Sequence, residues 1–275
     1  MNMRRLAIHS PFNAPVYHAE TVGSTMDVSR LLAADGEPHG TVITADFQEA
    51  GRGRGRERTW DTDRGKNLPF TILLRYGRIE TIPPALTLRA GLAVALAIED
   101  FAPSLTGAIT VKWPNDVMIR AAGGVKKAAG ILTEAEGGTV HIGIGINVAQ
   151  TEFPGFLRDT AISISLALGG KTAPAARFTL LEKTLFRLYR ELETPEGNAG
   201  TGNALDWRER LEQRLYQKGE QVAFIAGAPG SDRIVEGRLA GIGAGGELLL
   251  VPKGETGARP FITGELAPTV NKLRA

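Results

Sequence analysis

The sequence predicts an α+β protein in which a mixed β-sheet packs with helices and a small β-barrel follows in the C-terminal part of the chain. Through roughly the first two hundred residues, helical patterns alternate with short β-branched runs. From about Val222 onward, short strands are separated by glycines, which is typical of small barrels. We therefore expect a larger domain over residues 1–218 and a smaller one over 219–275.

The first predicted elements are two helices and two strands. Ser24 or Thr25 can cap a helix that runs to about Ala34. An apolar, alanine-rich helix is predicted at 85–101, because it follows a Pro-Pro pair and stops before Pro103. β-branched and apolar runs predict strands at 41–47 and 68–74.

The middle of the chain continues the alternation. Strands are predicted at 109–113, 130–134 and 139–148, with Gly137-Gly138 as the turn between the last two. Leucines and Phe178 recur at helical spacing up to Leu192, which predicts a helix with one buried stripe. Residues 195–203 suit an exposed connection, and a further helix is predicted at 205–216. The C-terminal strands are expected at 222–226, 234–242 and 247–251.

Composition excludes several classes of protein. The 275 residues contain no cysteine and four histidines, which rules out disulfides and thiolate chemistry and disfavours a zinc site. No apolar stretch is expected to approach the roughly 20 residues that span a bilayer, and the first residues lack the core of a signal peptide. We expect a soluble, cytoplasmic protein without a membrane partner.

One loop concentrates positive charge. Residues 51–58 contain four arginines and one glutamate, a net charge of +3, whereas the formal net charge of the whole chain is +2. Three glycines in the same loop make it costly to order. We expect the loop to order around an anion such as a phosphate, pyrophosphate or carboxylate. A nucleic-acid patch or a solvated surface is the alternative interpretation.

Three further stretches suit a binding site. Pro114, in Lys112-Trp113-Pro114-Asn115-Asp116, directs Asn115 and Asp116 out of the preceding strand. Lys127 lies just before a strand that opens with Gly130, where a fixed cation would suit a carboxylate or phosphate. Alternating glycines in 143–147 leave room for a ligand beside the strand, and Asn147 adds an amide.

Taken singly, each stretch also has a structural explanation. Lys112 to Asp116 could be a turn with a core tryptophan, and the alternating glycines could relieve crowding in the sheet. Ser24 and Thr25 could serve only as a helix cap, and Lys127 could be an ordinary surface lysine. The order in which the stretches follow one another is harder to explain structurally.

That order resembles the catalytic domain of biotin protein ligases. The resemblance is carried by Ser24-Thr25, Gln48 with residues 51–54, residues 112–116, Lys127 with residues 130–132, and residues 143–147. The C-terminal segment, with Gly237, residues 248–250 and residues 264–266, resembles the small SH3-like domain of the same proteins. The fold implied for the larger domain is that shared by these ligases and class II aminoacyl-tRNA synthetases.

The resemblance implies a ligase that uses ATP and Mg²⁺ to convert biotin to biotinyl-5′-adenylate and then transfers biotin to a lysine of a biotin carboxyl carrier protein or domain. It implies catalytic roles for Lys127, Arg54 and Asp116, with Asp116 also the candidate magnesium ligand. The implied biotin-binding residues are Ser24, Thr25, Met26, Gln48, Arg52, Gly53, Arg54, Lys127 and Gly130. The implied ATP-binding residues are Arg52, Arg54, Arg56, Lys112, Asn115 and Asn147.

Some features depart from the family pattern. Met26 stands where the family usually has asparagine, and the arginine loop takes a longer path to its tryptophan. Too few residues precede Ser24 for an N-terminal helix-turn-helix, so DNA binding is not expected. A homodimer is possible. Lipoate or octanoyl transfer and non-enzymatic biotin binding are the rival functions.

Overall fold

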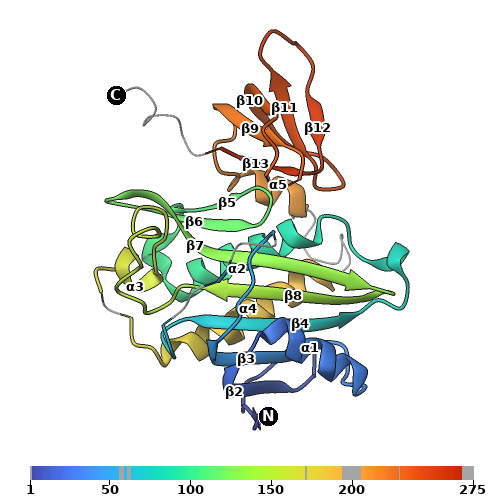
Figure 1. Ribbon diagram of the computed structural model, residues 1–275, viewed down its shortest axis with the longest axis vertical. Helices are drawn as coiled ribbons and strands as arrows, with labels where there is room; N and C mark the ends of the chain where they lie inside the picture. Colours follow the sequence, from blue (N-terminus) through green and yellow to red (C-terminus); the bar gives the residue numbers. More distant parts are fainter. Residues whose placement is uncertain are drawn as a thin grey trace.

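The computed structural model describes residues 2–55, 59–60, 63–170, 172–193, 206–228 and 230–267. Within them, the chain forms two β-sheets, one above the other in Figure 1. The strands of the larger sheet are β1 (Arg4–Arg5), β2 (Val16–Val22), β3 (Thr41–Gln48), β4 (Leu68–Arg75), β5 (Ile109–Lys112), β6 (Asp116–Ala121), β7 (Gly124–Glu136) and β8 (Thr139–Ile146). The strands of the smaller sheet are β9 (Gln221–Ala226), β10 (Ile234–Ile242), β11 (Leu248–Pro252), β12 (Arg259–Phe261) and β13 (Gly264–Leu266).

The larger sheet is mixed, as predicted. Its strand order is β1-β2-β3-β4-β8-β7-β6-β5. Strands β2 and β3 pair in parallel, and all other neighbouring strands of this sheet pair antiparallel. The turn between β7 and β8 contains Gly137 and Gly138, with φ of +56° and +83°, a conformation that glycine adopts readily. The predicted glycine turn is therefore confirmed.

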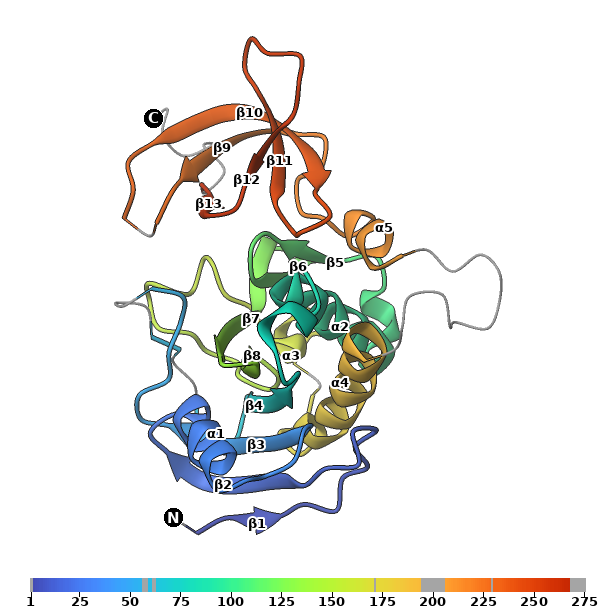
Figure 2. The same ribbon diagram turned by 90° about the vertical axis from the view of Figure 1, so that its right-hand side faces the viewer.

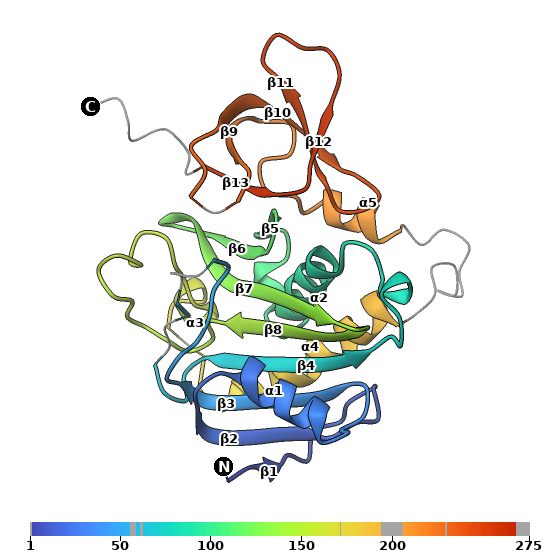
Figure 3. The same cartoon turned by 45° about the vertical axis from the view of Figure 1, so that its right-hand side comes forward.

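Helices cover both faces of the larger sheet (Figures 2 and 3). Helix α1 (Thr25–Ala34) lies on one face, against β3, β4 and β8. Helices α2 (Leu86–Phe101) and α4 (Ala176–Leu192) pack against each other on the opposite face. The short helices α3 (Ile164–Ala167) and α5 (Trp207–Glu212) lie beyond the sheet, together with 3-10 turns at Ile79–Thr81 and Pro103–Leu105.

The face beneath α2 and α4 holds the main core. Phe70 and Ile72 of β4 and Ile142 of β8 are fully buried there. Polar contacts join the helices at their edge. The side chain of Glu191 of α4, a residue 1% exposed, forms an ion pair with Arg210 of α5, and the Arg89 side chain of α2 donates a hydrogen bond to the backbone carbonyl oxygen of Glu191. A buried carboxylate is stable only when paired in this way.

Five antiparallel strands form the smaller sheet, in the order β12-β11-β10-β9-β13. Two residues alone separate β12 from β13, so the chain passes directly from one edge strand to the other and the sheet curls back on itself. This agrees with the small β domain predicted here, although no pairing joins β12 to β13 among the strands described. The sheet contacts the larger domain through Trp113, whose Nε1 donates to the carbonyl oxygen of Gly246 at 3.0 Å and whose ring packs against Phe224. We propose that the domain boundary lies between residues 218 and 219.

Several predicted elements need correction. The strand expected at 130–134 begins at Gly124 and pairs with β6, which was not predicted. The helix expected at 205–216 is shorter, and the predicted connection at 195–203 lies outside the described residues. Strands β1, β2, β12 and β13 and helix α3 were also missed, because each is short or depends on partners distant in sequence.

One expectation about apolar length was too strict. The stretch Ile79–Phe101, with mean hydropathy 1.5, is long and apolar enough by composition to cross a bilayer. Most of it is buried within the protein, where α2 packs against α4 and the sheet. Ala90, Leu92 and Val94 are completely enclosed, so this stretch is the core helix of the larger domain.

Candidate active site

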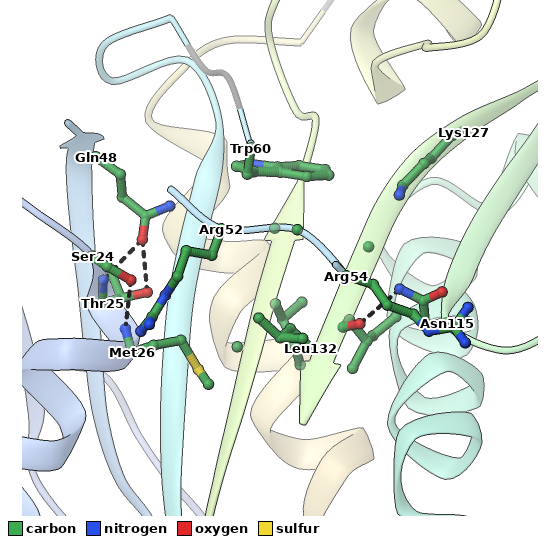
Figure 4. Close-up of a pocket in the computed structure, with 16 residues that line it drawn as sticks. Ser24, Thr25, Met26, Gln48, Arg52, Arg54, Trp60, Asn115, Lys127 and Leu132 are labelled. Carbon is green, nitrogen blue, oxygen red and sulfur yellow. Dashed lines mark hydrogen bonds between the residues drawn. The ribbon is translucent and has the colours of Figure 1, made fainter. Parts of the chain in front are cut away.

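One pocket gathers most of the predicted site residues (Figure 4). It lies on the α1 face of the larger sheet and encloses about 50 Å³, less than the roughly 300 Å³ of a typical small-molecule site. A ligand must therefore displace part of the wall. The lining residues are Ser24, Thr25, Met26, Gln48, Arg52, Gly53, Arg54, Trp60, Asn115, Lys127, Gly130, Ile131, Leu132, Gly143, Ile144 and Gly145.

The start of α1 and the end of β3 form a polar corner. Gln48 Oε1 accepts hydrogen bonds from the backbone N–H of Thr25 at 2.8 Å and from its hydroxyl at 3.0 Å. The hydroxyl of Thr71 in turn donates to Thr25 Oγ1 at 2.9 Å. This chain fixes the orientation of the Gln48 amide, so its NH₂ group is the donor presented to a ligand. Ser24 caps α1 by accepting from the N–H of Met26, which leaves its hydroxyl hydrogen to donate.

Glycines form the floor of the pocket. Gly130 of β7 lies directly opposite Gly145 of β8, and Gly143 lies opposite Leu132. A Cβ atom at Gly145 would lie 2.3 Å from Cε2 of Trp60, and one at Gly143 would lie 2.8 Å from Sδ of Met26. The missing side chains make room for Trp60 and Met26. The ligand expected beside this strand stays a prediction.

The described part of the arginine loop, residues 51–55, forms the roof of the pocket together with Trp60. It folds back on itself, since Arg52 pairs with Thr59 in an antiparallel bridge and the N–H of Trp60 donates to the carbonyl oxygen of Gly51. Arg52 Nη2 donates to Asp27 Oδ1 of α1 at 2.7 Å, and Arg54 Nη1 donates to the carbonyl oxygen of Gly264 in the smaller sheet at 2.8 Å. The loop therefore spans from α1 to the second sheet.

A β-bulge aims Lys127 into the pocket. Val117 pairs with Ala129 and Met118 with Lys127, so Ala128 is an extra residue on β7. The bulge moves Lys127 to the pocket face, where its Nζ lies 2.6 Å from Asp116 Oδ1 and 5.7 Å from the centre of the Trp60 ring. The Lys127 backbone is also fixed, because its N–H donates to Thr160 and its carbonyl accepts from Ile162. Lys127 thus lies inside β7, not before a strand as the sequence suggested.

The other predicted ligands have different positions. Asn115 lines the pocket, and its Nδ2 donates to the carbonyl oxygen of Ile131 at 3.0 Å. Asp116 contacts the pocket through Lys127, while Lys112, its cross-strand partner, does not line it. Asn147 is 4% exposed and donates to the carbonyl oxygen of Ile162, away from the pocket lining. Arg56 lies outside the described residues.

Trp60 is the main pocket residue that the sequence interpretation missed. Its ring occupies the space above Gly130 and Gly145, and its Nε1 is buried without a hydrogen-bond partner in the part of the chain that the structure describes. A buried donor without a partner is costly, which suits a group that bonds to a ligand or moves when one enters. The clue in the sequence was a tryptophan closely following a glycine-rich basic loop.

The arrangement combines hydrogen-bond donors at one end of the pocket with cations at the other. Such a site suits a molecule with a polar head and an anionic tail, and the cations can neutralise a phosphoryl group during transfer. No group of three or more acidic or histidine side chains that could enclose a metal occurs among the described residues. Asp116 stays the predicted magnesium ligand, and its Oδ1 lies 2.6 Å from Lys127 Nζ.

Comparison with known proteins gives the class. A sequence model of the biotin/lipoate A/B protein ligase family matches residues 19–149, which include all the strands that line the pocket. The chain is 37% identical over 186 residues to a bifunctional ligase/repressor of Bacillus subtilis, covering 65% of this chain but 54% of that protein. It thus spans about half the length of that relative.

A second relative is matched over most of its length. The chain is 33% identical over 254 residues to the biotin–[acetyl-CoA-carboxylase] ligase of Mycobacterium tuberculosis, with 86% of each chain covered. The solved structure of Aquifex aeolicus biotin protein ligase in complex with biotin and ATP superposes with a TM-score of 0.71 at 27% identity, covering 92% of this chain and 97% of that one. The chain belongs to the biotin protein ligase family.

Proposed function

We propose that the protein activates biotin with ATP to biotinyl-5′-adenylate and transfers biotin to a specific lysine of a biotin carboxyl carrier protein or domain. The observation that carries this proposal is the convergence of five separated stretches of sequence on one pocket with donors at one end and cations at the other. The ureido group of biotin suits the Ser24 hydroxyl and the Gln48 amide. A lipoyl ring offers no comparable hydrogen-bonding group, so the same corner favours biotin.

In the first step, a carboxylate oxygen of biotin forms a bond to the α-phosphorus of ATP, and the bond from that phosphorus to the bridging oxygen breaks to release pyrophosphate. The cations of Lys127 and Arg54 would neutralise the carboxylate and the phosphoryl oxygens as they approach. Lys127 would then exchange its ion pair with Asp116 for the substrate. Arg52 and Gly53 would cover the bound biotin.

In the second step, the ε-amine of the acceptor lysine attacks the acyl carbon, the bond from that carbon to the phosphate oxygen breaks, and AMP leaves as the nitrogen loses a proton. Asp116, once released by Lys127, is our candidate for orienting that amine. Asn115, Lys112, Asn147 and Arg56 remain predicted contacts of the nucleotide. Asp116 remains the predicted magnesium ligand. We expect the enzyme to be cytoplasmic, and a homodimer stays a prediction.

The test is direct. Purified protein with biotin and Mg·ATP should release pyrophosphate, and mass spectrometry should detect biotinyl-adenylate. Addition of a biotin carboxyl carrier domain should then consume the adenylate and label one lysine. Lipoate and octanoate in place of biotin serve as controls. Adenylate formed from lipoate but not from biotin would overturn the proposal, and biotin binding without pyrophosphate release would indicate a binding protein.

A further inference from the structure

Asp27 connects helix α1 with the arginine loop, which both border the pocket, but Asp27 does not itself line the pocket. It occupies the third position of α1, directly after the pocket residues Ser24 to Met26. Its Oδ1 accepts one hydrogen bond from Arg52 Nη2 and one from Arg30 Nη1, each at 2.7 Å. The first of these bonds connects α1 with the arginine loop at the roof of the pocket.

The carboxylate is itself held in place from the sheet. Arg30 bonds to Asp27 through one guanidinium nitrogen and to Glu134 of β7 through the other. Four alternating charges, Glu134, Arg30, Asp27 and Arg52, therefore run from the floor strand over α1 to the loop. Because Arg30 is fixed at both ends, Asp27 presents its oxygen to Arg52 at a defined place.

We propose that Asp27 is a positioning residue for the biotin ligase reaction, which tethers Arg52 and thereby holds the arginine loop and Trp60 over the pocket. This proposal rests on the proposed function of the same pocket. A helix N-terminus also favours an acidic side chain, so a merely structural role for Asp27 is the alternative. The two roles differ in what they affect, since helix stability does not determine how fast the loop opens.

The tether should be modest in strength and sensitive to salt. The side chains of Asp27 and Arg52 are 57% and 39% exposed, and an exposed pair of this kind changes an equilibrium by about two- to fivefold. In Asp27→Asn, we expect biotinyl-adenylate to dissociate about threefold faster and the KM for biotin to rise similarly, with kcat for adenylate formation little changed. Added salt should speed adenylate release from the parent more than from Asp27→Asn.

The experiment compares Asp27→Asn with Asp27→Glu, Arg52→Gln, the double variant Asp27→Asn/Arg52→Gln, and a control, Asp35→Asn, at the other end of α1. Filtration first removes free biotin from the protein, and the dissociation of biotinyl-adenylate from the protein is then followed over time. A second readout, independent of catalysis, is the rate of trypsin cleavage after Arg54 in the ligand-free protein. We expect Asp27→Asn to release biotinyl-adenylate faster and to be cleaved faster than the parent, with both rates partly restored in Asp27→Glu. Asp35→Asn should match the parent in both rates. The double variant should release adenylate and be cleaved no faster than Arg52→Gln alone.

Equal trypsin cleavage of the parent and Asp27→Asn would overturn the tether, whatever the activity. A lower unfolding temperature with unchanged release, or additive effects in the double variant, would also overturn it and leave the structural role. If the parent itself forms no adenylate, the proposed function fails, and the cleavage rates still decide whether Asp27 holds the loop.

Discussion

The two faces of strands β4, β8 and β7 use their side chains in opposite ways. On the face covered by α2 and α4, Phe70 and Ile142 are completely buried in the core. On the α1 face, β7 and β8 carry Gly130, Gly143 and Gly145, and Trp60 and Met26 occupy the space that these glycines leave. Because successive residues of a strand point to opposite faces, one run of sequence provides both a core and a ligand floor. Substitutions at adjacent positions should therefore separate stability from binding.

The largest effect expected on the pocket face is that of Lys127→Ala. Loss of a charge at a phosphoryl transition state costs roughly 3 kcal/mol, about a hundredfold in rate or more. Exchange of labelled pyrophosphate into ATP should fall by this factor while the unfolding temperature stays near that of the parent, because the Lys127 backbone bonds remain. An exchange rate close to the parental one would remove Lys127 from the mechanism.

Gly145→Ala and Ile142→Ala test the contrast between the faces. The added methyl group of Gly145→Ala would meet the Trp60 ring at 2.3 Å and should expel it, raising the KM for biotin by roughly tenfold, about 1.4 kcal/mol. Ile142→Ala should instead cost about 2–5 kcal/mol of folding stability. Calorimetry and biotin binding together would show whether the two effects separate.

Gly143→Ala is the matched control for Gly145→Ala. Its methyl group meets the end of the flexible Met26 side chain, which can move aside, so we expect a change in KM below about threefold. If Gly143→Ala and Gly145→Ala raised the KM for biotin equally, general crowding in the sheet would explain both effects, and the space that Gly145 leaves for Trp60 would not.

The roof can be tested separately from the floor. Arg54→Gly removes the bond to Gly264, so the variant should still make biotinyl-adenylate but release it, and biotin should then label serum albumin added as a bystander. We expect labelling at least about threefold above the parent at equal adenylate turnover, the effect of losing a charge-assisted bond. Bystander labelling equal to that of the parent would mean that Arg54 does not retain the intermediate.

The smallest effects concern pH. Burial, assisted by Arg30, lowers the pKa of His141 on the pocket face from its ordinary value of 6.5, so its contribution to stability is lost as pH falls below 6.5. A hydrogen bond to Glu193 raises the pKa of His39, so that contribution is full below 6.5 and lost as pH rises through the folded-state pKa.

His141→Gln should therefore flatten the acid side of the stability profile, and His39→Gln should flatten the alkaline side. Thermal unfolding followed between about pH 5 and 8, where histidine titrates, measures both slopes. If His141→Gln changed the alkaline side of the profile, or His39→Gln the acid side, the direction of that histidine's pKa shift would be wrong.

Local signals in the sequence predicted the elements that carry the site. The Ser24 cap, the strand leading to the arginine loop and the glycine turn between β7 and β8 each follow from residues close together in the chain. It was the resemblance to a family that placed Thr25, Gln48 and Lys127 at one site and gave them roles, which remain predictions.

Features that depend on tertiary partners were not predictable. The Trp60 position follows from the loop closing on Gly51, and the Lys127 orientation follows from a bulge that pairing with β6 creates. Asn147 looked like a free amide in sequence, whereas the returning segment at Ile162 accepts its hydrogen bond. Strand β2 lacks a strong alternation of apolar residues, and its parallel partner becomes evident only in the folded sheet.

The contact between the two sheets has an evolutionary consequence. Trp113 and Arg54 both bond to main-chain oxygens of glycines in the smaller sheet, Gly246 and Gly264. A Cβ atom would lie 2.8 Å from Ala85 at the first and 2.3 Å from Phe224 at the second. Since any other residue there supplies the same oxygen but not the space, the contact between the two sheets tolerates little change at these two glycines, whatever side chains surround them.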